Sequence, residues 1–199
     1  IEELEESDLY FSFDLFAFEH KLEDAVSNPE KIHNILENNT YLIEEDQEAH
    51  ADEGHSHGDY DPHVWFSVDI DSSIAENIKN VLSEKYPEKK DIFEKNYSDF
   101  ISEVNSFKTQ LKNTLNSKKS KIFVIYHPAL TYFAKEYGLT QISIEQEGKE
   151  PTAQYLKNVI NEIKKNNVKL LLVQPQFPKS SVDLISKEVP DIKIIEFNP

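Results

Sequence analysis

From Lys119 to the end of the chain, short apolar runs rich in β-branched residues alternate with amphipathic segments. The runs read KIFVIY, LTQISI, VKLLLV and IKIIEF, and the segments between them read ALTYFAKEYG, TAQYLKNVINEIKKNN and PKSSVDLISKEV. Such alternation is typical of parallel strands joined by right-handed helical crossovers. The sequence therefore predicts an α/β fold with a parallel-type sheet for residues 119–199.

A long apolar stripe at helical spacing precedes this region and predicts one helix over residues 91–118, which could connect two lobes rigidly. Before it, Ile70, Ile74, Ile78, Val81 and Leu82 predict another helix that ends at Tyr86-Pro87, with Asp69, Asp71 and Ser72 as candidate caps. Short strands are expected in DLYFSFDLF and TYLIEE. We therefore expect an N-terminal lobe (1–90), a linking helix (91–118) and a C-terminal lobe (119–199).

The composition restricts the partners and the kind of metal site. With 37 acidic and 21 basic residues, the formal net charge is -16, so the chain lacks the basic surface that nucleic acid requires. Because there is no cysteine, any metal must be held by nitrogen and oxygen ligands. No apolar run approaches the roughly 20 residues of a membrane span. The chain opens on IEELEESDLY, without Met or a signal peptide, so we expect a trimmed fragment or a processed chain.

Four of the seven histidines lie in the segment HADEGHSHGDYDPHVW. Residues 44–61 show neither helical nor strand periodicity, which predicts a loop. His50, His55 and His57 lie in this loop among carboxylates, and they could coordinate a metal ion weakly. A solvated acidic linker is the alternative interpretation of the same residues.

Two further histidines follow patterns that favour a fixed position. His63 lies in DPHVW, in what is expected to be a short extended segment, and either packs beside Trp65 or points into a cleft. In the second case Asp61 would accept a hydrogen bond and fix its tautomer. His127 directly follows KIFVIY, at the strand end where ligands collect in open α/β sheets, although a structural role at the turn is the alternative.

Other polar residues follow later strands. Gln174-Pro-Gln176 and Asn198-Pro199 are either ordinary turns or polar groups at the same sheet edge. Glu145 and Glu147, in SIEQEGKEP, could be a base, metal ligands or exposed acids of a turn. His20 and His33 are interpreted as surface or packing residues. Hydrolytic chemistry has little support, since GxSxG, HExxH, P-loop and GxGxxG motifs are all missing from the sequence.

The order of these motifs resembles that of a known family. The motifs follow one another along the chain as DPHVWFSVD, the helix NYSDFISEVNSFKTQL, VIYHPALTYFAKEYGL and EGKEPTAQYLKNVINEIKKNNVKLLLVQPQF, and the resemblance covers nearly all of residues 7–199. Together they are similar to the zinc-binding solute-binding proteins of ABC importers, the ZnuA/TroA-like family. The resemblance implies two α/β lobes joined by a long rigid helix, with an incomplete N-terminal lobe here and one metal ion in the cleft between the lobes.

The resemblance also implies a set of metal ligands. Family members use an early histidine of the N-terminal lobe, the DPHxW histidine, the YHxAF histidine and a carboxylate soon after the last strand present here. His63 matches the second ligand and His127 the third, whereas the first is expected upstream of IEELEESDLY. Asn198 lies where the carboxylate is expected, and either its neutral amide replaces that ligand or the chain stops before it. This chain is thus expected to carry half of the primary site.

Zinc is the metal that the resemblance implies. Nitrogen-rich coordination suits zinc better than manganese, and a His-rich loop before DPH is a feature of the zinc branch. In that branch the loop, here with His50, His55 and His57, collects or senses zinc. Manganese-specific relatives replace the YHxAF histidine and use a Glu from the stretch matching EQEG, so Glu145 and Glu147 keep manganese as the alternative.

The resemblance further implies an extracytoplasmic protein, in the periplasm or at the cell surface, with a lipid anchor in the precursor as an option. It would pass zinc to the membrane permease of an ABC importer. We expect a monomer without catalytic turnover and without nucleic-acid partners. A surface adhesin of the same fold and a zinc hydrolase with an open metal position are the alternatives.

Overall fold

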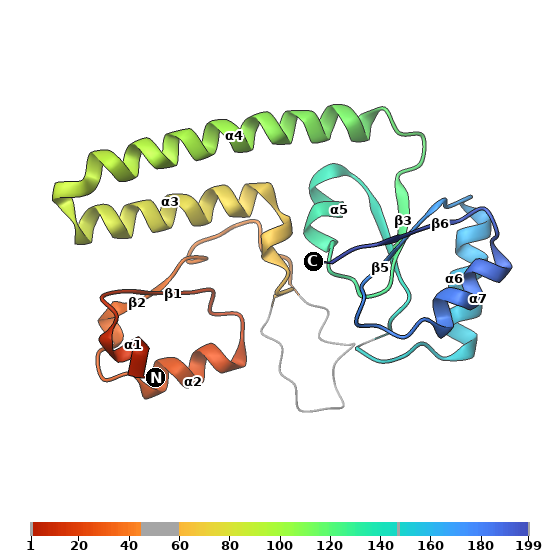
Figure 1. Cartoon of the computed structure of the whole chain (residues 1–199), viewed down its shortest axis with the longest axis horizontal. Helices are drawn as coiled ribbons and strands as arrows, with labels where there is room; N and C mark the ends of the chain where they lie inside the picture. Colours follow the sequence, from red (N-terminus) through yellow and green to blue (C-terminus); the bar gives the residue numbers. More distant parts are fainter. Residues whose placement is uncertain (1, 45–59, 147, 199) are drawn as a thin grey trace. The chain divides into compact units, whose positions relative to one another are not determined.

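The structure is a computed structural model that describes residues 2–44, 60–146 and 148–198. It divides into two compact units, Ile1–Leu111 and Lys112–Pro199, which are treated separately below (Figure 1). The boundary falls inside the long helix α4 (Lys90–Asn116). The division into lobes at residues 90 and 118, and the role of this helix as a rigid link, stay predictions. Within the described ranges, none of the helices is long and apolar enough to cross a membrane.

The second unit is built on a four-stranded parallel sheet in the order β4-β3-β5-β6. The strands are β3 (Ile122–Ile125), β4 (Thr140–Ser143), β5 (Leu170–Val173) and β6 (Lys193–Glu196). The helices between them are α5 (Thr131–Tyr137), α6 (Ala153–Lys165) and α7 (Ser180–Glu188). The predicted alternation, and with it the α/β fold class, is confirmed.

The core of this unit lies between the sheet and two helices. Val124 of β3 and Leu171 of β5 are fully buried because central strands are covered on both faces. Helix α6 buries Leu156, Val159, Ile160 and Ile163, which recur at helical spacing, and Figure 1 shows α6 and α7 together on one side of the sheet. Each such side chain contributes roughly 1.5–3 kcal/mol on burial. A sheet held in this way is a rigid base for the residues at its edge.

The strand order creates a topological switch point. The chain steps from β3 to β4 on one side and then crosses over to β5 on the other side of β3. The carboxyl ends of β3 and β5 therefore meet where the order reverses, the place at which open α/β sheets bind ligands. His127 and Gln174 lie just beyond these two strand ends.

The first unit contains a two-stranded parallel sheet and two long helices. The sheet pairs β1 (Tyr10–Ser12) with β2 (Ile32–Asn34). The short helix α1 (Glu2–Glu6) precedes β1, and α2 (Ala17–Ala25) and η1 (Pro29–Lys31) lie between the two strands in sequence. The 3-10 helix η3 (Val64–Phe66), α3 (Val68–Lys85) and η4 (Pro87–Lys89) then lead into α4. The strand expected in DLYFSFDLF is present as β1.

The prediction of a strand in TYLIEE is wrong. Residues 40–43 form a turn and irregular backbone, and Glu44 makes only an isolated bridge with Tyr60. Asn38 has a positive φ of 61°, and the Asn39 side chain accepts a hydrogen bond from the Tyr41 amide at 2.9 Å. These local asparagine contacts compete with strand pairing. The second strand is formed instead by Ile32–Asn34, which includes His33.

Helix α3 begins earlier than the sequence predicted. Its N-cap is Ser67, whose hydroxyl accepts a hydrogen bond from the Ile70 amide at 3.2 Å. The expected caps Asp69, Asp71 and Ser72 lie inside the helix, where Ser72 donates back to the Val68 carbonyl at 2.8 Å. The helix ends before Pro87, as predicted.

Helix α4 carries the predicted apolar stripe, but none of its described residues is buried. Phe100 and Phe107 are 41% and 53% exposed. Lys108 of α4 forms an ion pair with Asp69 of α3, and Lys79 of α3 forms another with Glu94 at 3.6 Å. These pairs join the two helices. Most of the apolar stripe of α4, including Phe93, Tyr97 and Val104, is half-buried.

Candidate metal centre

His63 lies in a tight turn at the start of η3. The sequence predicted an extended segment, but His63 is the N-cap of this 3-10 helix, with φ -79° and ψ 41°. Pro62 fixes the backbone before it, and the Val64 amide donates to the Pro62 carbonyl at 2.8 Å. Val64 is fully buried and anchors the turn, while Trp65 is 44% exposed and meets the His63 ring edge-on at 5.6 Å. The His63 side chain is half-buried, with 19% of it exposed.

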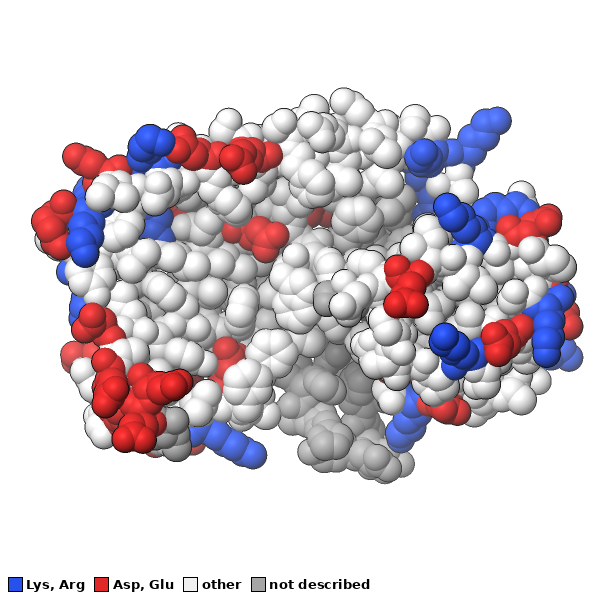
Figure 2. Space-filling model, in the orientation of Figure 1, with Lys and Arg blue, Asp and Glu red and all other residues white. Residues whose placement is uncertain are grey.

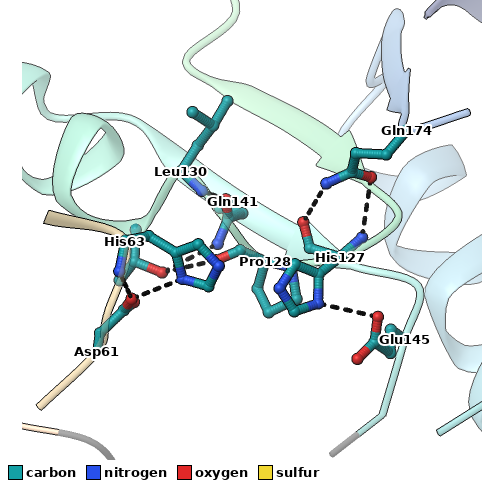
Figure 3. A network of polar contacts seen from close by, with 9 residues as sticks. Asp61, His63, His127, Pro128, Leu130, Gln141, Glu145 and Gln174 are labelled. Atoms are coloured by element: carbon teal, nitrogen blue, oxygen red, sulfur yellow. Dashed lines mark hydrogen bonds and ion pairs between the residues drawn. The ribbon is translucent and has the colours of Figure 1, made fainter. Parts of the chain in front are cut away.

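Asp61 holds His63 by two hydrogen bonds to one oxygen. Its Oδ1 accepts from the His63 amide at 2.9 Å and lies 2.7 Å from His63 Nδ1 (Figure 3). Asp61 is itself tied to the preceding chain, because its amide donates to the Ile43 carbonyl at 2.9 Å. A carboxylate beside Nδ1 favours the tautomer with the proton on Nδ1. The other nitrogen, Nε2, then keeps a lone pair that can bind a metal.

His127 follows β3 and has its backbone held on both sides. Its amide donates to Gln174 Oε1 at 3.2 Å, and its carbonyl accepts from Gln174 Nε2 at 3.0 Å (Figure 3). The Ala129 amide also donates to this carbonyl at 2.7 Å. Gln174 has no exposed surface, so its two hydrogen bonds are made in a buried environment, where they are electrostatically stronger than in water. Gln174 therefore fixes the peptide that presents the His127 side chain.

Sequence reasoning treated Gln174 as part of a possible turn and did not assign it this role. A polar residue directly after an apolar central strand was the available signal. The same turn brings Phe177 onto the ring of His127, stacked at a centroid distance of 5.6 Å, and onto Tyr126 at 4.7 Å. Burial raises the pKa of Tyr126, and the carboxylates of Glu150 and Glu145 raise it further. The ring of Phe177 thus covers one face of the His127 imidazole.

Glu145 follows β4 and lies against the imidazole of His127. Its Oε2 is 3.0 Å from His127 Nδ1, and its amide donates to the Tyr126 carbonyl at 2.9 Å. The carboxylate is 7% exposed, whereas the His127 side chain is 32% exposed. Gly148, with a φ of 74°, permits the tight turn in which Gln146 and Lys149 pair. Glu145 and Asp61 therefore make the same kind of contact, each with the Nδ1 of one candidate histidine.

The other predicted site residues are distributed as follows. Asn198 is exposed just after β6, at the same sheet edge as His127. His50, His55, His57 and Glu147 lie outside the described residues. His20 is a surface residue whose Nδ1 is 3.3 Å from Asp14 Oδ1, and His33 lies in β2 with its ring 6.3 Å from Phe11. The described residues thus present two histidines with the same local geometry, one in each unit.

The two units differ in charge. Most of the acidic residues of the chain lie in Ile1–Leu111, whereas lysines outnumber acids in Lys112–Pro199. In Figure 2 a dense group of carboxylates covers the part of the first unit that contains α1, whose first turn carries Glu2, Glu3 and Glu5. A negative surface raises the local concentration of cations, which suits a protein that handles a metal ion.

Comparison with known proteins shows which family and which individual proteins this chain resembles. The family described as zinc-uptake complex component A, periplasmic (ZnuA), matches residues 1–199. The zinc-binding lipoprotein AdcA of Streptococcus pneumoniae (strain R6) is 34% identical over 158 residues, which is 78% of this chain and 31% of that protein. The high-affinity zinc uptake system protein ZnuA of Bacillus subtilis (strain 168) is 29% identical over 131 residues, 65% of this chain and 41% of that protein.

Solved structures agree with the sequence relatives. A crystal structure of ZnuA superimposes with a TM-score of 0.82 at 30% identity, covering 99% of this chain and 74% of that one. The laminin-binding adhesin Lmb of Streptococcus agalactiae, in a mutant structure, gives a TM-score of 0.78 at 25% identity, covering 97% and 71%. The chain spans about a third of the length of the curated AdcA proteins that it matches.

The description of the family also agrees with the expected extracytoplasmic location, since it names a periplasmic component. No finding favours the manganese alternative: the matching family, AdcA and the ZnuA protein of Bacillus subtilis are all described as zinc-binding or zinc-uptake proteins. The match over residues 1–199 and the likeness of the fold lead to one conclusion: this chain belongs to the ZnuA family of zinc-uptake components.

Proposed function

We propose that this chain captures zinc outside the cytoplasm and delivers it to the membrane permease of an ABC importer. His63 and His127 are two of the protein ligands of the transported ion in this proposal. Zinc is the cargo of the protein and undergoes no reaction, so the chain has no catalytic turnover. The proposal follows the zinc-related descriptions of the AdcA and ZnuA relatives.

One observation carries the assignment of the ligands. Both histidines have a carboxylate oxygen next to Nδ1, at 2.7 Å for His63 and 3.0 Å for His127. Metal-binding histidines usually donate their second ring N–H to such a partner, which orients the ring and makes the binding nitrogen more basic. Nitrogen ligands suit zinc. Because cysteine is missing from the sequence, the imidazole nitrogen of histidine is the softest metal ligand among the side chains of this protein.

The contact of Glu145 with His127 favours one role for this carboxylate over another. Glu145 was expected to be a base, a metal ligand or an exposed acid of a turn. With its Oε2 3.0 Å from His127 Nδ1 and only 7% of its side chain exposed, we assign it to the orientation of His127. Asp61 has the same role for His63. In this assignment Asn198, Glu147 and the loop histidines His50, His55 and His57 stay secondary candidates.

Calorimetric zinc titration tests the ligands. The tightest zinc-binding step should be lost in His63→Ala and in His127→Ala, because each removes one nitrogen donor. His33→Ala is the matched control, since His33 lies in β2 of the first unit and is not part of the proposed site. Deletion of residues 48–58 should remove weaker binding steps only. If the double variant His63→Ala/His127→Ala binds zinc as tightly as the parent chain, the assignment is wrong.

A second experiment separates the roles of Glu145. X-ray absorption of the zinc-loaded chain should show the same number of ligands in Glu145→Gln as in the parent, with an affinity lower by about 10–100-fold. Loss of one oxygen ligand from the spectrum would instead make Glu145 a direct ligand.

Adhesion is a second candidate function, and it is supported only by the structural likeness to Lmb. Binding to laminin that survives chelation of zinc would support it.

A further inference from the structure

We propose that Asp14, His20 and Glu23 form a second binding site for a divalent transition-metal ion such as zinc. Each of the three residues offers one ligand atom, and these atoms lie within 4.8 Å of one another. None of them belongs to the centre proposed for the transported ion. The proposal does not depend on the function proposed above.

The sequence brings the three side chains together by two local rules. His20 and Glu23 are three residues apart on α2, so they project from the same face of the helix. Asp14 lies in the turn between β1 and α2, with a positive φ of 56°. This turn folds Asp14 back over the helix, where its Oδ1 comes within 3.3 Å of His20 Nδ1.

A buried carboxylate holds this turn rigid. Glu19 is 3% exposed, and its two oxygens accept hydrogen bonds from the amides of Phe13, Leu15 and Phe16 at 2.9, 3.1 and 3.1 Å. These amides flank Asp14 on both sides in the chain. Because Glu19 precedes His20 directly, the same contacts fix the start of the helix that carries the other two residues. The backbone that carries the three candidate ligands is therefore held in place before any ion binds.

Neutral donors from the two strands orient the two carboxylates. Ser12, which is fully buried, donates from its Oγ to Glu23 Oε1 at 3.0 Å. The side-chain amide of Asn34 donates from Nδ2 to Asp14 Oδ2 at 3.2 Å. Hydrogen bonds of this kind from outside a ligand set orient ligand carboxylates in metal sites. They take one oxygen of each carboxylate, and Asp14 turns its other oxygen toward His20.

The charge and chemistry of the group fit a dication. A neutral imidazole with two carboxylates carries two negative charges, and neither carboxylate forms an ion pair with a lysine in the part of the chain that the structure describes. One nitrogen and two oxygen donors, with water completing the shell, suit zinc and its neighbours in the first transition row. The His20 and Asp14 side chains are 57% and 44% exposed, so an ion can enter and leave freely.

Nuclear magnetic resonance of the histidine ring nitrogens tests the site separately from all others. The His20 signals are identified by their loss in His20→Gln, and zinc is added to the whole chain beyond saturation of the tighter sites. We expect the His20 ring nitrogens to shift with a midpoint of their own. Asp14→Asn and Glu23→Gln should each raise that midpoint by at least about 10-fold. Asparagine tolerates a positive φ, and glutamine keeps the acceptor for Ser12, so both variants preserve the fold.

Asp24→Asn is the matched control. Asp24 is exposed and lies next to Glu23 on the same helix, but it does not belong to the proposed site. The Asp24→Asn substitution removes the same charge as Glu23→Gln. It should change the midpoint by less than about 2-fold, because an exposed charge outside the ligand set is largely screened by salt. The proposal is overturned if zinc does not shift the His20 nitrogens. It is also overturned if Asp24→Asn raises the midpoint as much as Glu23→Gln does, since the cause would then be a diffuse negative field.

Discussion

Replacement of Gln174 by leucine should both destabilise the second unit and weaken zinc binding. Leucine has nearly the same volume as glutamine, so the change creates no large cavity at this fully buried position. It removes the acceptor of the His127 amide, at 3.2 Å, and the donor to the His127 carbonyl, at 3.0 Å. The two losses are unequal, because the carbonyl keeps its hydrogen bond from the Ala129 amide at 2.7 Å.

The expected magnitude follows from this asymmetry. The main loss is the hydrogen bond from the His127 amide to Gln174, and removal of one hydrogen-bond partner from a buried polar group costs about 1–3 kcal/mol. We therefore expect the free energy of unfolding to fall by that amount and not by twice as much. Zinc affinity should fall by about 10-fold or more, in the range seen when a group that orients a metal ligand is removed.

Urea denaturation followed by circular dichroism and zinc calorimetry measure the two effects. Gln141→Leu is the matched control, because Gln141 also bridges this loop, accepting from the Leu130 amide at 3.0 Å and donating to Thr131 at 3.3 Å. It should lower stability to a similar degree but leave zinc affinity close to that of the parent. If Gln174→Leu unfolds at the parent urea concentration, or if both variants lose zinc affinity equally, the reasoning about Gln174 is refuted.

Three further results are expected. Asp61→Asn should weaken zinc binding by about 10–100-fold in calorimetry while His63 stays in place, because the amide is a poorer acceptor for Nδ1; unchanged affinity would contradict this. Ser67→Ala should lower the free energy of unfolding by about 1 kcal/mol in urea, through loss of the N-cap of α3, whereas Ser67→Thr should lose little. The hydrogen bond from Lys164 lowers the pKa of Glu188, so this pair stabilises the fold at pH values above the ordinary glutamate pKa, and the contribution is lost as the pH falls through the lowered pKa. Lys164→Gln should therefore raise the pKa of Glu188 in a carbon-13 titration. An unchanged pKa would argue against the contact.

The predictions that the sequence supported best rest on periodicity, which depends on neighbouring residues alone. The alternation from Lys119 onward predicted the four parallel strands and three helices of the second unit, because apolar runs and helical stripes bury one face whatever their partners are. The position of His127 after β3 followed from the same pattern. The family was identified from DPHVW and VIYHPALTYF, and the match over residues 1–199 confirms it.

Local predictions failed where short polar contacts outweighed the pattern. TYLIEE has the composition of a strand, yet the side chain of Asn39 and the positive φ of Asn38 form a turn there. The N-cap of α3 is Ser67 and not one of the acids that follow it. Both outcomes depend on single hydrogen bonds, which residue types alone do not determine.

Only the tertiary structure decided which distant residues meet. Gln174 and Glu145 are 47 and 18 residues from His127 in sequence, and parallel pairing brings both to the carboxyl end of β3. Likewise Asp14 approaches His20 because the buried carboxylate of Glu19 folds the intervening turn. Sequence thus determined the elements and the candidate histidines. The partners that orient those histidines depend on strand order and on buried hydrogen bonds, and these are satisfied only when the whole sheet has formed.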